Sequence, residues 1–132
     1  MRLREIMQKD VIWVDADTPL AELGKLLLEQ RISGLPVLSS EGELMGVVSK
    51  TDLLRNQAEL AKSGQGSREV WEIMSAEVLS AGPDDDVKDV AKKMLERRVH
   101  RVVVFEGTRM VGIASAFDFL KVAAAGPADT SI

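Results

Sequence analysis

The chain repeats itself once, and this internal repeat constrains its fold more than any other feature of the sequence. The segment Glu5-Ile6-Met7 recurs as Glu72-Ile73-Met74, 67 positions later. The same offset relates Val11 to Val78, Asp17 to Asp84, Lys25 to Lys92, Leu28-Glu29 to Leu95-Glu96, Arg31 to Arg98 and Val37 to Val104. The offset then falls to 66, because the second copy is one residue shorter in a turn, and it relates Gly46 to Gly112, Ser49 to Ser115 and Asp52 to Asp118. Such an ordered series indicates a duplicated unit of about 50–55 residues.

Each copy begins with a short strand and an amphipathic helix. In the first copy the apolar run 11–14 predicts the strand. The residues Asp17-Thr18-Pro19 predict the start of the helix, with a capping side chain ahead of a proline in the first turn. Apolar residues then recur on one helical face. They are Leu20, Leu23, Leu26 and Leu27 in the first copy and Val87, Val90, Ala91 and Met94 in the second.

A hairpin and a second helix complete each copy. The hairpin strands are expected at 35–38 and 44–48, with a turn at Glu41-Gly42, and at 102–105 and 110–114, with a turn at Glu106-Gly107. Ser49 or Thr51 is placed to cap a helix that begins near Asp52, and Ser115 to cap one that begins near Asp118. The order β-α-β-β-α therefore occurs twice, which predicts an α+β protein.

The repeat divides the chain into two motifs, at 1–56 and 70–122. Residues 57–69 between them include Ser63-Gly64-Gln65-Gly66-Ser67, which predicts the tail of a helix followed by a flexible linker. Residues 123–132 are mostly small and include Gly126-Pro127, so we expect a flexible C-terminal tail.

Composition narrows the classes of function. A hydrophobic content of 45% with 29% charged residues is typical of a soluble globular protein, and no cysteine is present for a disulfide or a thiolate zinc site. The net charge of −4 argues against a nucleic-acid partner. We expect a cytoplasmic protein with no membrane partner, because neither a secretory signal nor an apolar run of ~18 residues occurs. No catalytic triad, P-loop or Rossmann fingerprint and no metal-ligand spacing is present, so we expect neither an enzyme nor a metal site.

Two stretches of the chain resemble a known family. The first is Ile32-Ser33-Gly34-Leu35-Pro36-Val37 followed by Gly46-Val47-Val48-Ser49-Lys50-Thr51-Asp52. The second is Val99-His100-Arg101-Val102-Val103-Val104 followed by Gly112-Ile113-Ala114-Ser115-Ala116-Phe117-Asp118. Each resembles a cystathionine β-synthase (CBS) domain, and two in register, spanning roughly 3–122, resemble a tandem pair.

The resemblance implies a stand-alone Bateman module. In such modules two CBS units pack sheet to sheet with pseudo-two-fold symmetry and enclose two clefts, and the modules commonly dimerise. Family members often bind AMP, ADP, ATP or S-adenosylmethionine in those clefts and regulate a separate effector protein. No cofactor is required.

The Ser and Asp of each signature are the first candidate ligand residues. The carboxylates of Asp52 and Asp118 can accept hydrogen bonds from both ribose hydroxyls, and such charge-assisted bonds are strong. The hydroxyls of Ser49 and Ser115 stand at a strand-to-helix junction, where backbone N–H groups also favour an anion. The alternative is that both aspartates only complement the helix dipole, with the serines as caps.

The pair His100-Arg101 distinguishes the second copy from the first. In nucleotide-binding relatives a His-Arg pair at this place contacts phosphate, and Arg can bind phosphate through two parallel hydrogen bonds. The alternative is a solvated surface pair. The first copy has Ser33-Gly34 there, and its Lys50 either substitutes in part or is simply solvated. The first cleft would then prefer an unphosphorylated adenosine compound, share Arg101, or stay empty.

Apolar candidates for the adenine follow from the family's architecture, in which the segment opening one copy lies against the signature of the other. Ile6 would then line the Asp118 cleft and Ile73 the Asp52 cleft, with Val48 and Ala114 facing the base. All four are equally compatible with an ordinary core.

The leading hypothesis is therefore a sensor of adenosine-containing ligands that acts as a homodimer or on a separate effector. The alternatives are a ligand-free dimerisation scaffold and a detached regulatory subunit of a metabolic enzyme such as IMP dehydrogenase.

Overall fold

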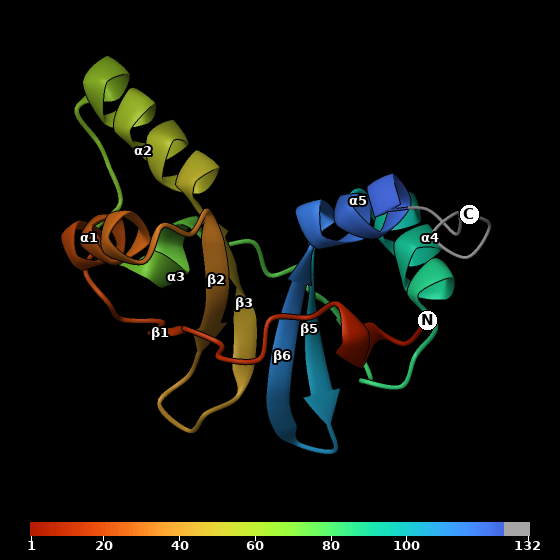
Figure 1. Cartoon of the computed structure of the whole chain (residues 1–132). Coiled ribbons are helices and arrows are strands. Elements are labelled where there is room, and N and C mark those ends of the chain that lie inside the picture. The colour runs from red at the N-terminus through yellow and green to blue at the C-terminus, as the bar shows by residue number, and fades with distance from the viewer. Residues whose placement is uncertain (126–132) are drawn as a thin grey trace. The chain divides into compact units, whose positions relative to one another are not determined.

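A computed structural model of the chain describes residues 1–125, which form two compact units (Figure 1). The unit here called the Asp52 unit comprises Ile12–Glu77. The unit called the Asp118 unit comprises Met1–Val11 together with the chain from Val78 onward. Each contains one three-stranded sheet and its helices, so the predicted α+β class is confirmed. The predicted tail falls partly on residues 126–132, which lie outside the described residues.

The Asp52 unit has the predicted order of elements. They are β1 (Val14–Asp15), α1 (Leu20–Gln30), β2 (Gly34–Leu38), β3 (Leu44–Ser49), α2 (Lys50–Ser63) and α3 (Val70–Ile73). In the sheet, β2 lies between β1, to which it is parallel, and β3, to which it is antiparallel. Gly42, in the hairpin turn, has a φ of 81°, a left-handed conformation that glycine adopts without steric cost.

The Asp118 unit repeats this order. Its elements are the 3-10 helix Leu3–Glu5, β4 (Leu79–Ala81), α4 (Val87–Arg97), β5 (Arg101–Glu106), β6 (Arg109–Ser115) and α5 (Ala116–Ala125). The central strand is β5, parallel to β4 and antiparallel to β6. Across the part of the chain that is described, none of the helices has both the length and the apolar character needed to cross a membrane.

Two local predictions differ from the structure. The first strand was expected at 11–14, but only Val14 and Asp15 find partners on β2, so β1 is shorter and later. Pro19 itself holds the N-cap position of α1 without a side-chain cap, because the N–H of Leu20 donates to the carbonyl of Arg68 instead. Helix α2 continues to Ser63, so residues 57–63 are the helical tail that the sequence predicted at the start of the linker segment.

The predicted helical faces form the two cores. Leu23 and Leu27 are buried in the Asp52 unit, with Leu20 and Leu26 packed against them. Val90 and Met94 are buried in the Asp118 unit. Both cores therefore form where the 3.6-residue period of the sequence placed them.

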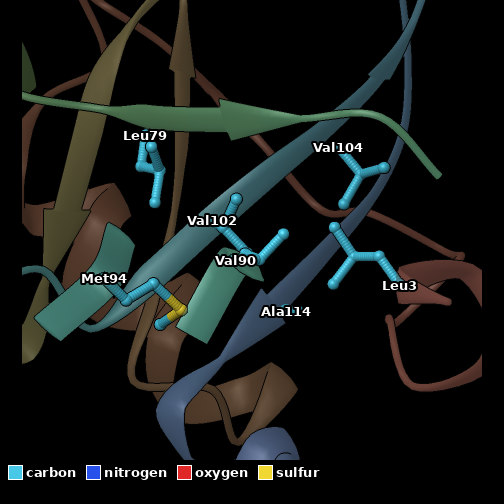
Figure 2. Packing of buried hydrophobic residues seen from close by; sticks show 7 residues of the cluster. All are labelled: Leu3, Leu79, Val90, Met94, Val102, Val104 and Ala114. Atoms are coloured by element: carbon cyan, nitrogen blue, oxygen red, sulfur yellow. The ribbon is translucent and has the colours of Figure 1, made fainter. Parts of the chain in front are cut away.

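Each core also takes in the opening segment of the other repeat. Leu3, fully buried, packs in the Asp118 unit against side chains from β4, α4, β5 and β6 (Figure 2). At the equivalent place in the Asp52 unit lies Val70, which is likewise fully buried. The compact units therefore differ from the sequence motifs 1–56 and 70–122, because the two motifs exchange their first residues.

In each unit, one backbone bridge holds the opening segment of the other repeat against the sheet. Gln8 and Ile113 exchange hydrogen bonds of 2.8 and 3.0 Å, and Ser75 and Val47 exchange bonds of 2.8 and 3.0 Å. The signature glycine beside each bridge allows the close approach. A Cβ on Gly112 would lie 2.5 Å from the Met7 sulfur and 3.0 Å from the Gln8 carbonyl oxygen. The glycine of the Gly–Ser–Asp signature thus has a packing role.

Candidate functional site

The serine and aspartate of each signature bond reciprocally at a strand-to-helix junction. In the Asp118 unit, the backbone N–H and the hydroxyl of Ser115 lie 2.9 and 3.2 Å from Asp118 Oδ2, and the N–H of Asp118 lies 3.4 Å from Ser115 Oγ. This arrangement satisfies donors at the start of α5 that would otherwise have no partner. The signature therefore caps its helix, and one carboxylate oxygen is left for another partner.

That second oxygen of Asp118 faces the opening segment of the chain. Gln8 Nε2 donates to Asp118 Oδ1 at 3.2 Å. Asp118 is only 6% exposed, and it is the one charged residue among the buried residues of the described chain. A carboxylate oxygen has about two acceptor positions, so a further donor at Oδ1 has to share this oxygen with Gln8 or displace it.

Asp118 lines a hollow of about 380 Å³. The other lining residues are Met1, Glu5, Ile6 and Gln8 from the opening segment and Lys121, Val122 and Ala125 from α5. The hollow thus combines apolar side chains, the buried carboxylate of Asp118, the exposed carboxylate of Glu5 and one lysine. Apolar walls with a few polar groups are typical of sites for small organic ligands. The structure brings together Ile6 and Asp118, as the sequence predicted.

His100 and Arg101 lie at the start of β5. His100 is exposed and its carbonyl accepts the N–H of Ala116 at 2.8 Å. Arg101 is half-buried and stands opposite Ser115 in the sheet. Neither residue, nor Ser115, is among the described residues that line the hollow. The predicted phosphate contacts are therefore next to the signature serine but outside this hollow.

The Asp52 unit has the same cap with different surroundings. Ser49 N and Oγ lie 2.8 and 2.9 Å from Asp52 Oδ2. The other oxygen, Oδ1, is paired with Arg55 Nη1 at 3.6 Å, an exposed partner from the same helix. Asp52 is half-buried, and Lys50 is the exposed first residue of α2. A ligand at Asp52 would therefore meet a carboxylate that already has a cation.

The apolar candidates divide into two pairs. Val48 and Ala114 are fully buried in the two cores, so in this structure they offer no surface to a ligand. Ile6 and Ile73 are half-buried and pack against the cores of the Asp118 and Asp52 units respectively. Each isoleucine thus lies in the unit that the predicted exchange assigned to it.

A second hollow, of about 580 Å³, lies in the Asp52 unit and contains none of the predicted site residues. It is lined by Asp15, Ala16, Asp17, Ser39, Ser40, Met45, Trp71 and Met74. This hollow is larger than the one at Asp118, but its two carboxylates, Asp15 and Asp17, are exposed to solvent. A buried carboxylate is the rarer feature, so the hollow around Asp118 is the better candidate.

The acidic run at the start of α4 has a structural role in each of its members. Asp86 caps the helix by accepting from Lys88 N at 2.7 Å, and Asp85 accepts from Gly82 N at 2.9 Å. Asp84 accepts from Arg4 Nε at 2.8 Å, and this hydrogen bond lowers the pKa of the Asp84 carboxyl, with further help from the charges of Arg4 and Arg2. Within residues 1–125, no group of three or more acidic or histidine side chains is arranged to hold a metal ion.

Sequence reasoning missed Gln8, Lys121 and Arg55. The predicted position of Ile6 was a usable signal for Gln8, since a segment that brings Ile6 to the Asp118 cleft also brings the residue two places further on. Lys121 and Arg55 each follow their aspartate by three positions, so they share a helical face with it.

Comparison with known proteins finds similar sequences in longer proteins. MJ1225, a protein of Methanocaldococcus jannaschii, is 29% identical over 119 residues, which cover 90% of this chain and 41% of the relative. The chain spans 22–41% of the length of the first curated relatives that it matches.

Two solved structures share the fold. The CBS domain pair of protein MJ0100, in complex with 5′-methylthioadenosine and S-adenosyl-L-methionine, has a TM-score of 0.81 and 25% identity, covering 95% of this chain and 97% of that one. CBSX2 in complex with AMP has a TM-score of 0.78 and 26% identity, covering 94% and 96%. The CBS domain model matches twice, at residues 3–59 and 70–125. The predicted resemblance is confirmed, and the chain belongs to the CBS domain family as a tandem pair.

Proposed function

We propose that the chain is a non-catalytic regulatory module that binds an adenosine-containing ligand at Asp118. The observation that carries the proposal is the buried Asp118 carboxylate, which lines a hollow. Ser115 fixes one of its oxygens, and the other accepts from Gln8, which lines the same hollow. A carboxylate in this position is suited to accept hydrogen bonds from ribose hydroxyls. The complexes of MJ0100 with two adenosine compounds and of CBSX2 with AMP support this ligand class.

The remaining site residues have distinct roles in this proposal. Ile6 supplies an apolar wall for the adenine, His100 supplies a hydrogen-bond donor for a phosphate, and Arg101 supplies a cation for it. The equivalent cleft at Asp52, with Ser49, Lys50 and Ile73, binds more weakly, because Arg55 already neutralises the carboxylate. Val48 and Ala114 support the signature strands from the core.

Regulation requires that the ligand favour one arrangement of the protein over another. We propose that the response passes to a second copy of the chain or to a separate effector protein in the cytoplasm, with no cofactor required. In this proposal the flexible part of the linker 57–69 is residues 64–66, since Ser67 and Arg68 are hydrogen-bonded to Asn56 and Leu20.

Isothermal titration calorimetry of the full chain with AMP, ADP, ATP, adenosine, S-adenosylmethionine and NAD tests the proposal. We expect saturable binding of at least one compound, and loss of at least tenfold in affinity in Asp118→Ala. Asp52→Ala is the matched control, since it removes the same cap from the other unit, and it should change the affinity much less.

Two outcomes would reject the proposal. Absence of binding for all six compounds would favour a ligand-free scaffold. Binding that survives Asp118→Ala but not Asp52→Ala would place the site in the other unit.

A further inference from the structure

Gln8 is fixed beside Asp118 by its backbone. Its N–H donates to the carbonyl of Ile113 at 2.8 Å, and its carbonyl accepts the N–H of Ile113 at 3.0 Å. Because both backbone groups are bonded to β6, the Cα of Gln8 stands at a fixed place on the edge of the sheet. Only the side chain of Gln8 is then free to choose a partner.

The side chain of Gln8 uses the oxygen of Asp118 that the helix cap leaves over. Nε2 lies 3.2 Å from Asp118 Oδ1, while Ser115 takes Oδ2. Both oxygens of a carboxylate that is 6% exposed are therefore engaged. Gln8 itself is exposed, so its amide can leave Asp118 and be solvated without a rearrangement of the backbone.

We propose that Gln8 is an internal competitor for the sugar-binding oxygen of Asp118, which a ribose hydroxyl has to displace. This inference rests on the proposed function and adds a determinant of affinity to it. In the ligand-free chain, Asp118 Oδ1 accepts a hydrogen bond from the side-chain amide of Gln8, and in the complex it would accept one from a ribose hydroxyl. A ligand therefore gains only the difference between its own hydrogen bond and that of Gln8.

The other unit shows what happens without such a residue. Ser75 makes the same backbone bridge there, to Val47, but its side chain is shorter by two heavy-atom bonds than that of Gln8. The oxygen of Asp52 that Ser49 does not use, Oδ1, is paired with Arg55 Nη1 at 3.6 Å. The amide competitor is thus specific to the unit with the buried carboxylate.

Calorimetry of AMP with the full-length Gln8→Ala variant tests the inference. The substitution keeps both backbone hydrogen bonds and removes the side-chain amide together with the methylene group that carries it. We expect AMP to bind about tenfold more tightly than to the unmodified chain, because a hydrogen bond to a charged group no longer has to be broken. Ser75→Ala is the matched control and should leave the affinity unchanged.

An affinity that is unchanged or weakened in Gln8→Ala overturns the inference, since Gln8 would then be a bystander or a ligand contact. In either case the proposed function stands if the unmodified chain binds AMP. If only Gln8→Ala binds AMP, both ideas are supported, with the competitor dominant.

If neither protein binds AMP, the titration is repeated with the other five compounds. If none of them binds, the proposed function fails, and the Gln8–Asp118 hydrogen bond is tested in the ligand-free chain. The side-chain amide resonances of Gln8 in a ¹⁵N-labelled sample should shift, and their hydrogen exchange should accelerate, in Asp118→Asn. Gln30, which is exposed, serves as the reference amide. Resonances of Gln8 that stay unchanged would overturn the inference without any ligand.

Discussion

Replacing Gly46 by alanine tests the packing role of the signature glycine. A Cβ at this position would overlap the carbonyl oxygen of Ser75 and would lie 3.1 Å from the Met74 sulfur and 3.2 Å from the Ser75 carbonyl carbon. The overlap involves backbone, which cannot rotate away as a side chain can. Strand β3 and the segment at Ser75 would have to separate, with loss of the 2.8 and 3.0 Å hydrogen bonds between Ser75 and Val47.

The expected cost follows from those contacts. Two backbone hydrogen bonds contribute about 1 kcal/mol each, and weaker packing of Met74 against the core adds to this, so the free energy of unfolding should fall by about 2–4 kcal/mol. Urea denaturation followed by circular dichroism measures the change.

Gly24→Ala is the matched control in the same unit. Its Cβ would meet only Leu53 Cδ2 at 3.4 Å, an ordinary contact, and alanine favours the interior of α1. It should stabilise the chain by about 0.5–1 kcal/mol. A Gly46→Ala variant within about 0.5 kcal/mol of the unmodified chain would refute the packing role.

Three further predictions test the exchange and the Arg4–Asp84 pair. Leu3→Ala should cost about 2–5 kcal/mol in urea denaturation, because Leu3 is fully buried, whereas Leu28→Ala, at a residue 71% exposed, should cost less than about 0.5 kcal/mol; equal effects would contradict the role of the opening segment. Because the pKa of Asp84 is lowered in the folded chain, its contribution is present above the ordinary value of 3.8 and lost as the pH falls through the lowered pKa. Asp84→Asn should therefore be less stable than the unmodified chain near neutral pH and equal to it in acid, and a difference that grows in acid would contradict the assignment. A fragment of residues 12–77 should show cooperative unfolding by circular dichroism while a fragment of equal length, 1–66, should not, because only the first contains Val70 with its core; the opposite result would contradict the unit boundaries.

The order of elements could be predicted from the sequence because its signals are local. The leucines of α1 and the valines of α4 repeat at helical spacing, and the turn glycines Gly42 and Gly107 mark both hairpins. The limits of β1 could not be predicted in this way, since Val14 and Asp15 become a strand only by pairing with Val37 and Leu38. A strand of two residues depends on its partner more than on its own composition.

The site could be predicted only in part, for a similar reason. Asp118, Ser115 and Ile6 were identified from the repeat and the family resemblance, and the structure places all three at or beside the hollow. Gln8 has no pattern of its own, because a glutamine near a chain end is usually solvated. Its relation to Asp118 depends on the bridge to Ile113, which joins residues more than a hundred positions apart.

The duplicated signature separates what the fold requires from what a ligand would require. Both aspartates accept from the N–H and the hydroxyl of their serine, so the helix cap alone accounts for a Ser and an Asp at this spacing in both units. Both glycines accommodate a crossing backbone, so the exchange accounts for them as well. The signature by itself is therefore weak evidence for a ligand. What distinguishes Asp118 is its second oxygen, which is buried beside a hollow and bonded to a displaceable amide, whereas the second oxygen of Asp52 is paired with an exposed arginine. Ligand binding at Asp118 should therefore depend on that one oxygen. Asp118→Ala removes the oxygen and Gln8→Ala removes its competitor, so the two variants should change ligand affinity in opposite directions.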